Sequence, residues 1–261
     1  MLPASLRVFT LQHAGNPVSV TTLGAGEPAL VFLSGLGDPA DWWLTVPTEQ
    51  EGQPHWNGDI HAGGPGLAVL LAGSTQVIAY DRAGIGGSPA PDHDRTLPEL
   101  HAELDAVLDA CQLSRPPVLV GHSLGGLIAY TYARRRPEAL AGLVLLDPTP
   151  LPMSPKPHGA GPERLALTHF VPSDVAANTL GGLPLLIVAP GNAETAPETS
   201  EQQRLHARFQ VRRQKHGKLL ATSTQSVGVW TSGAGHYVHL DAPGTVMEAV
   251  ATFIETARRS S

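Results

Sequence analysis

The sequence predicts an α/β protein built on an eight-stranded, mostly parallel sheet with helices on both faces. Short apolar runs, such as residues 143–146, alternate along the chain with stretches of helical periodicity, which is the pattern of βαβ units. Most of these runs are apolar at every residue, as expected for strands that are buried on both faces. A chain of 261 residues is near the upper size of one hydrophobic core, so we expect a single domain over residues 1–261.

The expected strands are of two kinds. The first two, at 6–13 and 17–23, alternate polar and apolar residues and are rich in β-branched side chains, which predicts an antiparallel hairpin at one edge of the sheet. The later ones are continuous apolar runs separated by helical patterns. They lie at residues 29–34, 76–81, 117–122, 142–147, 184–189 and 227–232.

Four helices are expected where apolar residues recur at steps of three and four. Leu97, Leu100 and Leu104 show this spacing in the first helix, and Val246 and Val250 lie on one face of the last. Both patterns are typical of amphipathic helices packed on a sheet. The four ranges are 97–112, 124–135, 198–216 and 243–258.

Two segments interrupt this alternation. Residues 47–66 are polar and rich in turn-forming residues, so we expect a long surface loop. Residues 148–182 begin with many prolines and lie between two expected parallel strands. Loops of this length inside a compact domain are usually functional or disordered. We expect the second segment to be a small cap, or lid, insertion over the ends of the strands.

Composition and charge exclude several classes of protein. The formal net charge of −6 gives no electrostatic footprint for nucleic acid, and no apolar run approaches the roughly 20 residues of a membrane helix. The N-terminal residues lack the pattern of a secretion signal. The single cysteine, Cys111, excludes an internal disulfide and a cysteine-based metal cluster, and its apolar neighbours favour a buried filler. We expect a cytoplasmic protein with no metal, no cofactor and neither nucleic acid nor membrane as a partner.

The strongest motif is Gly121-His-Ser123-Leu-Gly125, which follows the apolar run Val118–Val120 and precedes a helical pattern. G-x-S-x-G between a strand and a helix is the nucleophile-elbow pattern. The small residues on either side of the serine let the strand and the helix approach closely. The motif therefore predicts Ser123 as a catalytic nucleophile.

A serine hydroxyl needs a base, and the chain has twelve histidines. His236 is the best placed, because it lies in a glycine-rich loop after the last expected strand and before the last helix. That position is at the same sheet edge as Ser123. His239 is a less favoured base, and the side chain of His122 should point away from the tip of the turn.

Two carboxylates could orient the base. Asp147 directly ends the expected strand at 142–147, one strand after the nucleophile. Glu194 lies in the loop after the next strand. Either could reach a histidine at this edge of the sheet, so the residues alone leave both open.

An oxyanion hole needs two backbone N–H groups. The sequence predicts those of Leu124, at a helix N-terminus directly after the nucleophile, and of Leu36, in the glycine-rich loop after the strand at 29–34. Trp42 and Trp43 follow this loop and could line a substrate pocket. Packing in the core is an equal alternative for one of them.

These motifs together resemble the α/β-hydrolase fold family over nearly the whole chain. Residues 81–88 match the family's D-R-x-G-x-G-x-S turn, which implies a structural role for Asp81 and Arg82. Residues 235–243 match its histidine loop. Two departures stand out: Ser34 replaces the usual histidine of the oxyanion segment, and Glu194 occupies the usual position of the acid. The chain is similar to a subgroup that uses the aspartate after the sixth strand, which implies Asp147.

From the motifs and the resemblance we expect a serine hydrolase that cleaves a carboxylic ester or a related small acyl substrate through an acyl-enzyme. The same triad also serves C–C bond hydrolases, lactonases and cofactor-free haloperoxidase-type enzymes. A slow-turnover ligand-binding receptor is a rival of another class. A lid-dependent lipase is disfavoured, because residues 148–182 are short and polar for such a lid.

Overall fold

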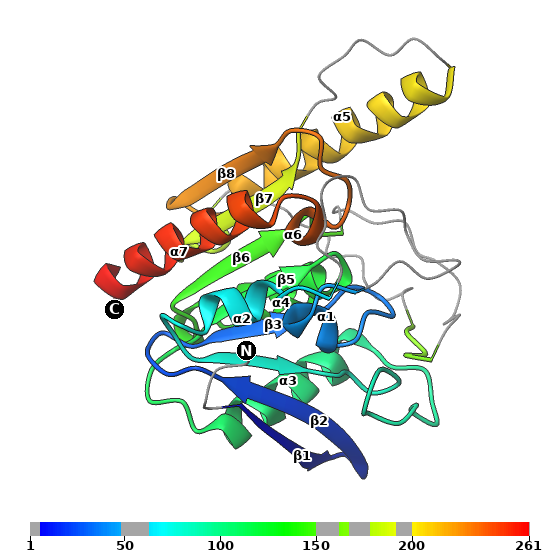
Figure 1. The fold of residues 1–261 in the computed structure, drawn as a ribbon, viewed down its shortest axis with the longest axis vertical. Helices are drawn as coiled ribbons and strands as arrows, with labels where there is room; N and C mark the ends of the chain where they lie inside the picture. The colour runs from blue at the N-terminus through cyan, green and yellow to red at the C-terminus, as the bar shows by residue number, and fades with distance from the viewer. Residues whose placement is uncertain (1–5, 48–62, 150–161, 167–177, 192–199, 261) are drawn as a thin grey trace.

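The computed structural model describes residues 6–47, 63–149, 162–166, 178–191 and 200–260. Eight strands form one sheet in the order β1-β2-β4-β3-β5-β6-β7-β8. The pairs β1–β2 and β2–β4 are antiparallel, and all other neighbours are parallel. This is the fold class that the sequence predicts, with the β1–β2 hairpin at one edge and β8 at the other (Figure 1).

The strands occupy the expected places, and none differs from its predicted range by more than one residue at either end. Each parallel strand is buried along its whole length in the middle of the sheet, as its continuous apolar sequence requires. The strands are β1 (Arg7–His13), β2 (Asn16–Leu23), β3 (Leu30–Leu33), β4 (Val77–Tyr80), β5 (Val118–His122), β6 (Gly142–Leu146), β7 (Leu185–Pro190) and β8 (Ser226–Thr231).

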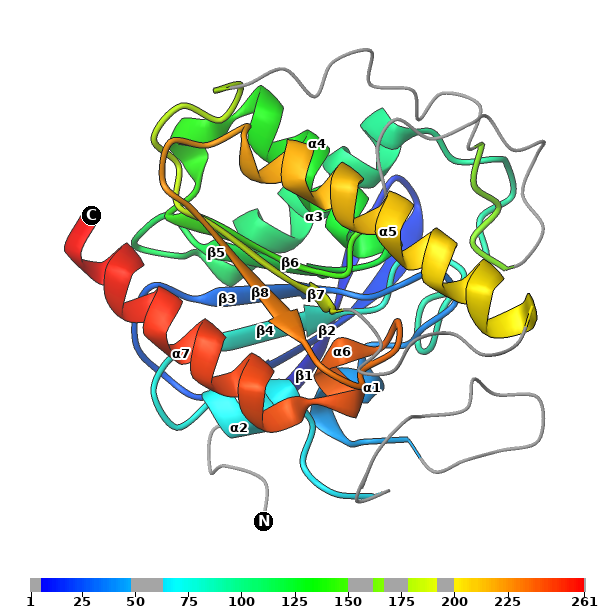
Figure 2. The ribbon, with the colours of Figure 1, turned by 90° about the horizontal axis from the view of Figure 1, so that it is seen from above.

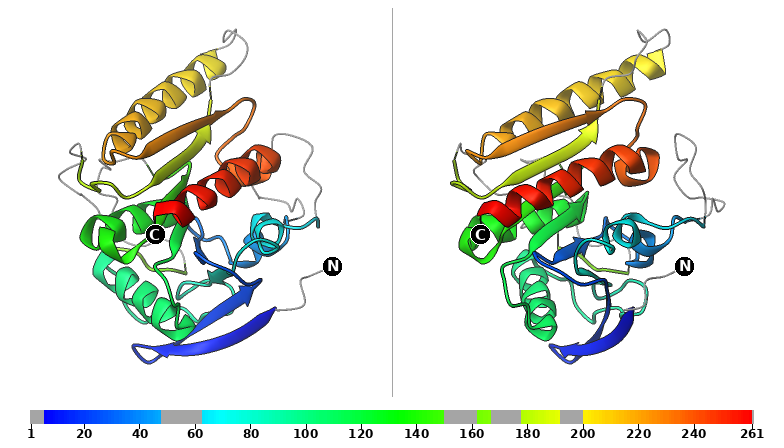
Figure 3. Two further views of the ribbon diagram at one scale, coloured as in Figure 1. Left: turned by 90° about the vertical axis from the view of Figure 1, so that its left-hand side faces the viewer. Right: turned by 60° about the vertical axis from the view of Figure 1, so that its left-hand side comes forward.

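The helices form two layers. The sheet lies between α3, α4 and α5 on one face and α1, α2 and α7 on the other (Figure 2). Successive side chains of a strand enter different cores: Val31 packs with α3 and α4, whereas Phe32 packs with α1 and α2. Figure 3 shows α5 over the β7–β8 end of the sheet, away from the β1–β2 hairpin. The helices are α1 (Asp41–Leu44), α2 (Leu67–Leu71), α3 (Leu97–Cys111), α4 (Leu124–Arg135), α5 (Ser200–Leu220), α6 (Val238–Asp241) and α7 (Pro243–Ser260), with a 3-10 turn, η1, at Pro137–Ala139.

Three of these helices are absent from the expectations. α1, α2 and α6 have four or five residues each, which is too short for a repeat of apolar residues to show. α5 also continues past its predicted end at residue 216. Gly217 is a typical helix end, but Leu219 inserts into the core and is only 1% exposed, so burial carries the helix to Leu220.

The two interrupting segments are described only in part. Residues 48–62 of the expected surface loop, and residues 150–161 and 167–177 of the expected cap, lie outside the described residues. The ends of the loop are close together, because Val46 exchanges backbone hydrogen bonds with Gly63 and Gly64. Within the second segment, residues 162–166 are described, and Arg95 pairs with Leu165 in an isolated bridge.

No helix in the described part of the chain is long and apolar enough to cross a membrane.

Candidate active site

Ser123 lies at the tip of a sharp turn between β5 and α4. Its φ of +51° and ψ of −112° are unusual for a residue with a side chain. The flanking glycines make this turn possible. A Cβ on Gly121 would lie 2.5 Å from the carbonyl oxygen of Gly125, and a Cβ on Gly125 would lie 2.0 Å from that of Leu33. Strained backbone of this kind is concentrated at functional sites.

The close contact at Gly125 gives a direct test. In Gly125→Ala the new methyl group meets backbone that cannot rotate away, so we expect a loss of roughly 3 kcal/mol or more in unfolding free energy. Gly73→Ala is the matched control, because a Cβ there has no heavy atom within 4 Å and should change stability by less than about 0.5 kcal/mol. Urea unfolding of both variants measures the difference. Equal stabilities would contradict this account of the turn.

The structure brings Ser123, His236 and Asp147 together in one line of contacts. The Oγ of Ser123 lies 2.9 Å from Nε2 of His236, and Nδ1 of His236 lies 2.6 Å from Oδ2 of Asp147. The three side chains come from the turn after β5, the loop after β8 and the end of β6. Parallel strands deliver their carboxyl ends to one edge of the sheet, which is why residues so distant in sequence meet there.

Asp147 is held on a rigid support. Its backbone N–H donates to the carbonyl of Val188 on β7 at 2.8 Å, its φ is +38°, and its side chain is 2% exposed. Burial alone would raise the pKa of this carboxyl group. The hydrogen bond from His236 and the charge of Arg212 outweigh burial and hold the pKa below its ordinary value.

His236 is the partly exposed member of the set, with 37% of its side chain accessible. Its pKa is lowered from the ordinary value, first by desolvation and then by the neighbouring His122 and Arg212, against the opposing effect of Asp147. A lowered pKa keeps the imidazole neutral near pH 7, which is the form that can accept a proton.

The alternatives to these residues lie elsewhere or outside the described chain. His239 is buried between Trp43 and His122, with ring centroids 4.5 and 4.8 Å away. His122 points away from the tip of the turn, and its Nε2 lies 3.0 Å from the backbone oxygen of His236. Glu194 falls outside the described residues.

The two predicted oxyanion amides flank the turn. Leu124 opens the 12-residue helix α4, so its N–H points out of the positive end of the helix dipole. Leu36 lies in the loop after β3, and β3 pairs with β5 in parallel register, with Leu33 opposite Gly121. Within the described part of the chain, neither amide donates to a protein acceptor.

A buried ion pair holds the loop that carries Leu36. Arg82 donates to the backbone oxygens of Ser34 and Gly35 at 2.7 and 2.6 Å, and its Nε lies 2.7 Å from Oε2 of Glu163. Glu163 in turn accepts the N–H of Gly37 at 2.8 Å. The segment at 162–166 is therefore tied to both the Asp81-Arg82 turn and the loop that carries Leu36.

The two tryptophans differ in their surroundings. Trp43 is 1% exposed, packs on Phe32 at 4.9 Å, and donates its indole N–H to the Oγ of Ser34 at 2.8 Å. Of the two alternatives that the sequence leaves for the tryptophans, Trp43 therefore takes packing in the core, where its ring lies under α2. Trp42 is half-buried beside Tyr237, at 5.8 Å between ring centroids, and so borders the histidine loop.

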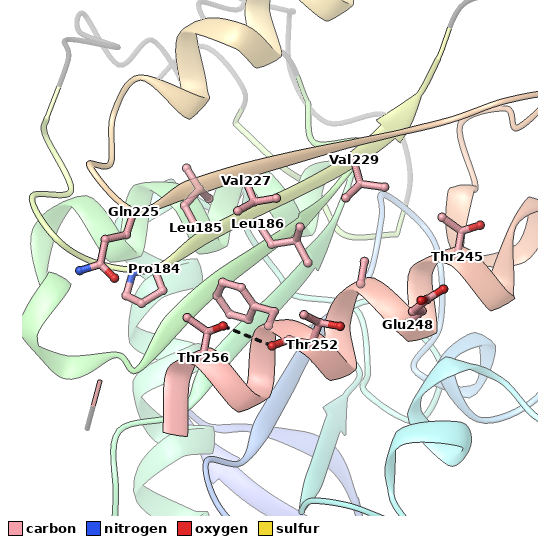
Figure 4. Close-up of a pocket in the computed structure, with 12 residues that line it drawn as sticks. Pro184, Leu185, Leu186, Gln225, Val227, Val229, Thr245, Glu248, Thr252 and Thr256 are labelled. Carbon is pink, nitrogen blue, oxygen red and sulfur yellow. Dashed lines mark hydrogen bonds between the residues drawn. The ribbon is translucent and has the colours of Figure 1, made fainter. Parts of the chain in front are cut away.

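A separate groove of about 350 Å³ lies between α7 and strands β7 and β8 (Figure 4). Leu186, Val227 and Phe253 contribute apolar surface, and Glu248 is the carboxylate among its lining residues. The residues that line this groove include no serine, cysteine or histidine, so it offers no nucleophile with a base. Among the described residues no group of three or more His, Cys, Asp or Glu side chains is arranged to hold a metal ion.

Fold and site geometry together define a hydrolase-type α/β domain, and the sequence comparison agrees. Residues 30–222 match the Alpha/beta hydrolase family, so the chain belongs to this family. It is 29% identical over 189 residues to the uncharacterized protein YqjL of Bacillus subtilis, covering 67% of this chain and 71% of YqjL. It is 31% identical over 122 residues to the (lyso)-N-acylphosphatidylethanolamine lipase of Mus musculus, which covers 44% of this chain but only 36% of the mouse protein.

Solved structures show the same fold. A thermophilic esterase from Thermogutta terrifontis superposes with a TM-score of 0.66 over 97% of this chain and 99% of its own, at 18% sequence identity. At that identity the likeness establishes the fold and leaves the substrate open. Family membership and relatives with hydrolase names support a hydrolase.

Proposed function

We propose that this protein is a serine hydrolase that cleaves a carboxylic ester or a related small acyl substrate. The observation that carries the proposal is the continuous contact from Ser123 Oγ to His236 Nε2 at 2.9 Å and from His236 Nδ1 to Asp147 at 2.6 Å. A nucleophile, a base and an orienting carboxylate in this order are the parts of acyl transfer to water. The names esterase, for a structural neighbour, and lipase, for a relative, are consistent with acyl-ester cleavage and add support.

The position of the hydrogen on the neutral His236 ring follows from its hydrogen-bond partners. Asp147 is a carboxylate and can only accept, so Nδ1 of His236 carries the hydrogen and Nε2 is left as the acceptor for the Ser123 hydroxyl. In the first step Oγ bonds to the substrate carbonyl carbon while its proton moves to Nε2. The carbonyl electrons move onto the oxygen, to which we expect the amides of Leu36 and Leu124 to donate.

Collapse of this intermediate expels the alcohol, which takes the proton from Nε2 and leaves the acyl group on Ser123. A water molecule then repeats the sequence: it gives a proton to His236, attacks the acyl carbon, and releases the carboxylic acid with the Ser123 hydroxyl restored. The reaction needs no cofactor. The substrate partner is thus a small acyl compound, and the expected cytoplasmic location belongs to the same proposal.

A panel of p-nitrophenyl esters with short and long acyl chains tests the proposal. We expect saturable release of p-nitrophenol from at least one acyl length, together with labelling of Ser123 by a fluorophosphonate. A ligand that raises the melting temperature without turnover of any ester, and without labelling, would instead support the receptor. Turnover restricted to a C–C bond substrate would keep the triad and overturn the ester assignment, whereas turnover restricted to lactones would narrow it to cyclic esters.

A further inference from the structure

Arg212 on α5 contacts the carboxylate of Asp147 through two of its nitrogen atoms. Its Nε donates to Oδ1 at 3.0 Å, and its Nη2 lies 2.9 Å from Oδ2. The same Nη2 donates to the backbone oxygen of Asp147 at 3.2 Å. Two parallel N–H to oxygen contacts are the strongest geometry that an arginine makes with a carboxylate, and they fix its orientation.

The guanidinium also lies next to the base. Its Nη2 is 3.1 Å from Nδ1 of His236, which already directs its hydrogen to Asp147. Two donors cannot bond to each other, so this contact places a permanent positive charge directly beside the imidazole ring. Arg212 is 29% exposed, so water screens that charge only in part.

We propose that Arg212 positions Asp147 and sets the lower end of the pH range in which His236 acts as a base. The inference rests on the proposed function, since it assigns Arg212 a role in the same triad. Nothing in the spacing of the motifs points to this residue. It reaches Asp147 because α5 packs over β7 and β8, next to the residue that follows β6.

The physical argument begins with charge compensation. A triad carboxylate normally attracts the positive charge that His236 gains during the reaction. Here the guanidinium already neutralises part of that carboxylate, so the imidazolium is less favoured and His236 stays neutral to a lower pH. The lowered pKa values of His236 and Asp147 both include a contribution from Arg212 in this direction.

Other titratable groups also surround His236, and His122 lowers its pKa alongside Arg212. His216, one turn further along α5, lies 3.6 Å from Oδ1 of Asp147 and 3.2 Å from the backbone oxygen of Pro148, and burial lowers its pKa. His122 faces the ring of His236 from β5, at 4.7 Å between centroids.

Two further groups lie behind His122. Its Nδ1 is 3.6 Å from Oδ2 of Asp38, and that carboxylate also accepts the hydroxyl of Tyr237. Buried His239 packs against the same ring, and its pKa lies well below the ordinary value. The two histidines of lowered pKa, His216 and His239, are neutral near pH 7, so Arg212 is the permanent cation in contact with Asp147 and His236 among the described residues.

The test compares the pH dependence of kcat/KM in the wild type, Arg212→Gln and Arg212→Lys. The acid limb is the part of the profile in which kcat/KM falls as the pH decreases. In the wild type its midpoint should lie below about pH 6.5, the ordinary pKa of histidine, because the pKa of His236 is lowered. Loss of the cation raises the pKa of the base, so the acid limb of Arg212→Gln should move up by about one pH unit. On that limb the variant should then be about tenfold less active than the wild type. Arg212→Lys keeps the charge and should keep the limb, with a lower plateau because an ammonium group cannot make both contacts.

Arg213→Gln is the matched control, because it removes the same charge from the next residue. Arg213 lies over the ring of Trp230, 5.1 Å from its centroid, so this variant should leave the limb in place. A uniform loss of activity at all pH values in Arg212→Gln would show a merely structural role and overturn the proposal. So would an equal shift of the limb in Arg213→Gln. If Arg212→Gln does not fold, a limb in Arg212→Lys that moves up by a full unit overturns it instead.

Failure of this inference can be told apart from failure of the proposed function. A wild type that hydrolyses esters and labels at Ser123, but whose acid limb does not respond to Arg212, overturns only the role of Arg212. A wild type with neither turnover nor labelling overturns both.

Discussion

Ser123→Ala should abolish ester turnover and fluorophosphonate labelling while leaving the protein folded. The change removes the only atom placed to receive the acyl group in the proposed mechanism, and triad nucleophiles contribute on the order of 10⁴- to 10⁶-fold to kcat. Alanine is the smallest change that keeps a side chain at this strained position, where φ is +51°. It removes one hydrogen bond, to His236, so we expect only a small effect on the melting temperature.

The measurement is kcat with the best p-nitrophenyl ester, accompanied by labelling and thermal unfolding of the same preparation. Ser74→Ala is a suitable control, because Ser74 is an exposed serine whose hydroxyl donates to the carbonyl of Leu71. It should keep full activity and full labelling. Undiminished turnover in Ser123→Ala would show that the activity arises at another site.

The sequence predicts the sheet, and which side chains meet at the strand ends, because both follow from short, local patterns. A run such as Val118–His122 is buried on both faces and can be read as a strand without knowing its neighbours. Ser123, Asp147 and His236 stand directly after strands, or in the loop before a helix, so the parallel topology alone brings them to one edge.

The contacts that the sequence does not predict join distant segments. Arg212 lies in the middle of α5, where a charged residue normally indicates a solvated helix face. Glu163 lies in the segment at 162–166, 81 residues from its partner Arg82. No periodicity signals either contact, because each depends on how one segment crosses another. The pattern of two adjacent tryptophans likewise does not show that Trp43 faces inward to bond with Ser34.

Asp147→Asn should lower kcat by about 10⁴-fold with little change in KM. Both carboxylate oxygens of Asp147 accept hydrogen bonds, Oδ1 from Arg212 and Oδ2 from His236. An amide of the same size has a single oxygen. If that oxygen faces Arg212, the amide N–H₂ faces His236 and favours the tautomer with hydrogen on Nε2, which cannot accept the Ser123 proton. If it faces His236, the N–H₂ group meets the donors of Arg212.

The difference in unfolding free energy between the wild type and Asp147→Asn should decrease as the pH falls. Because the pKa of Asp147 is below its ordinary value in the folded protein, its ionised form stabilises the fold at neutral pH. That contribution is lost as the pH falls through the folded pKa. The gap in unfolding free energy between the wild type and Asp147→Asn should therefore narrow below about pH 4. A gap that stays constant with pH would show that Asp147 is not ionised in this way.

Glu194→Gln decides between the two carboxylates that the sequence left open. It makes the same chemical change in the loop after β7, at the position where most members of the family carry the acid. Because Asp147 already contacts His236 at 2.6 Å, Glu194→Gln should retain the wild-type kcat. Under the same conditions the kcat of Asp147→Asn should be lower by several orders of magnitude. The reverse result, a large loss in Glu194→Gln with activity kept in Asp147→Asn, would assign the orienting role to Glu194. It would also remove the basis for a role of Arg212, because the arginine acts through Asp147.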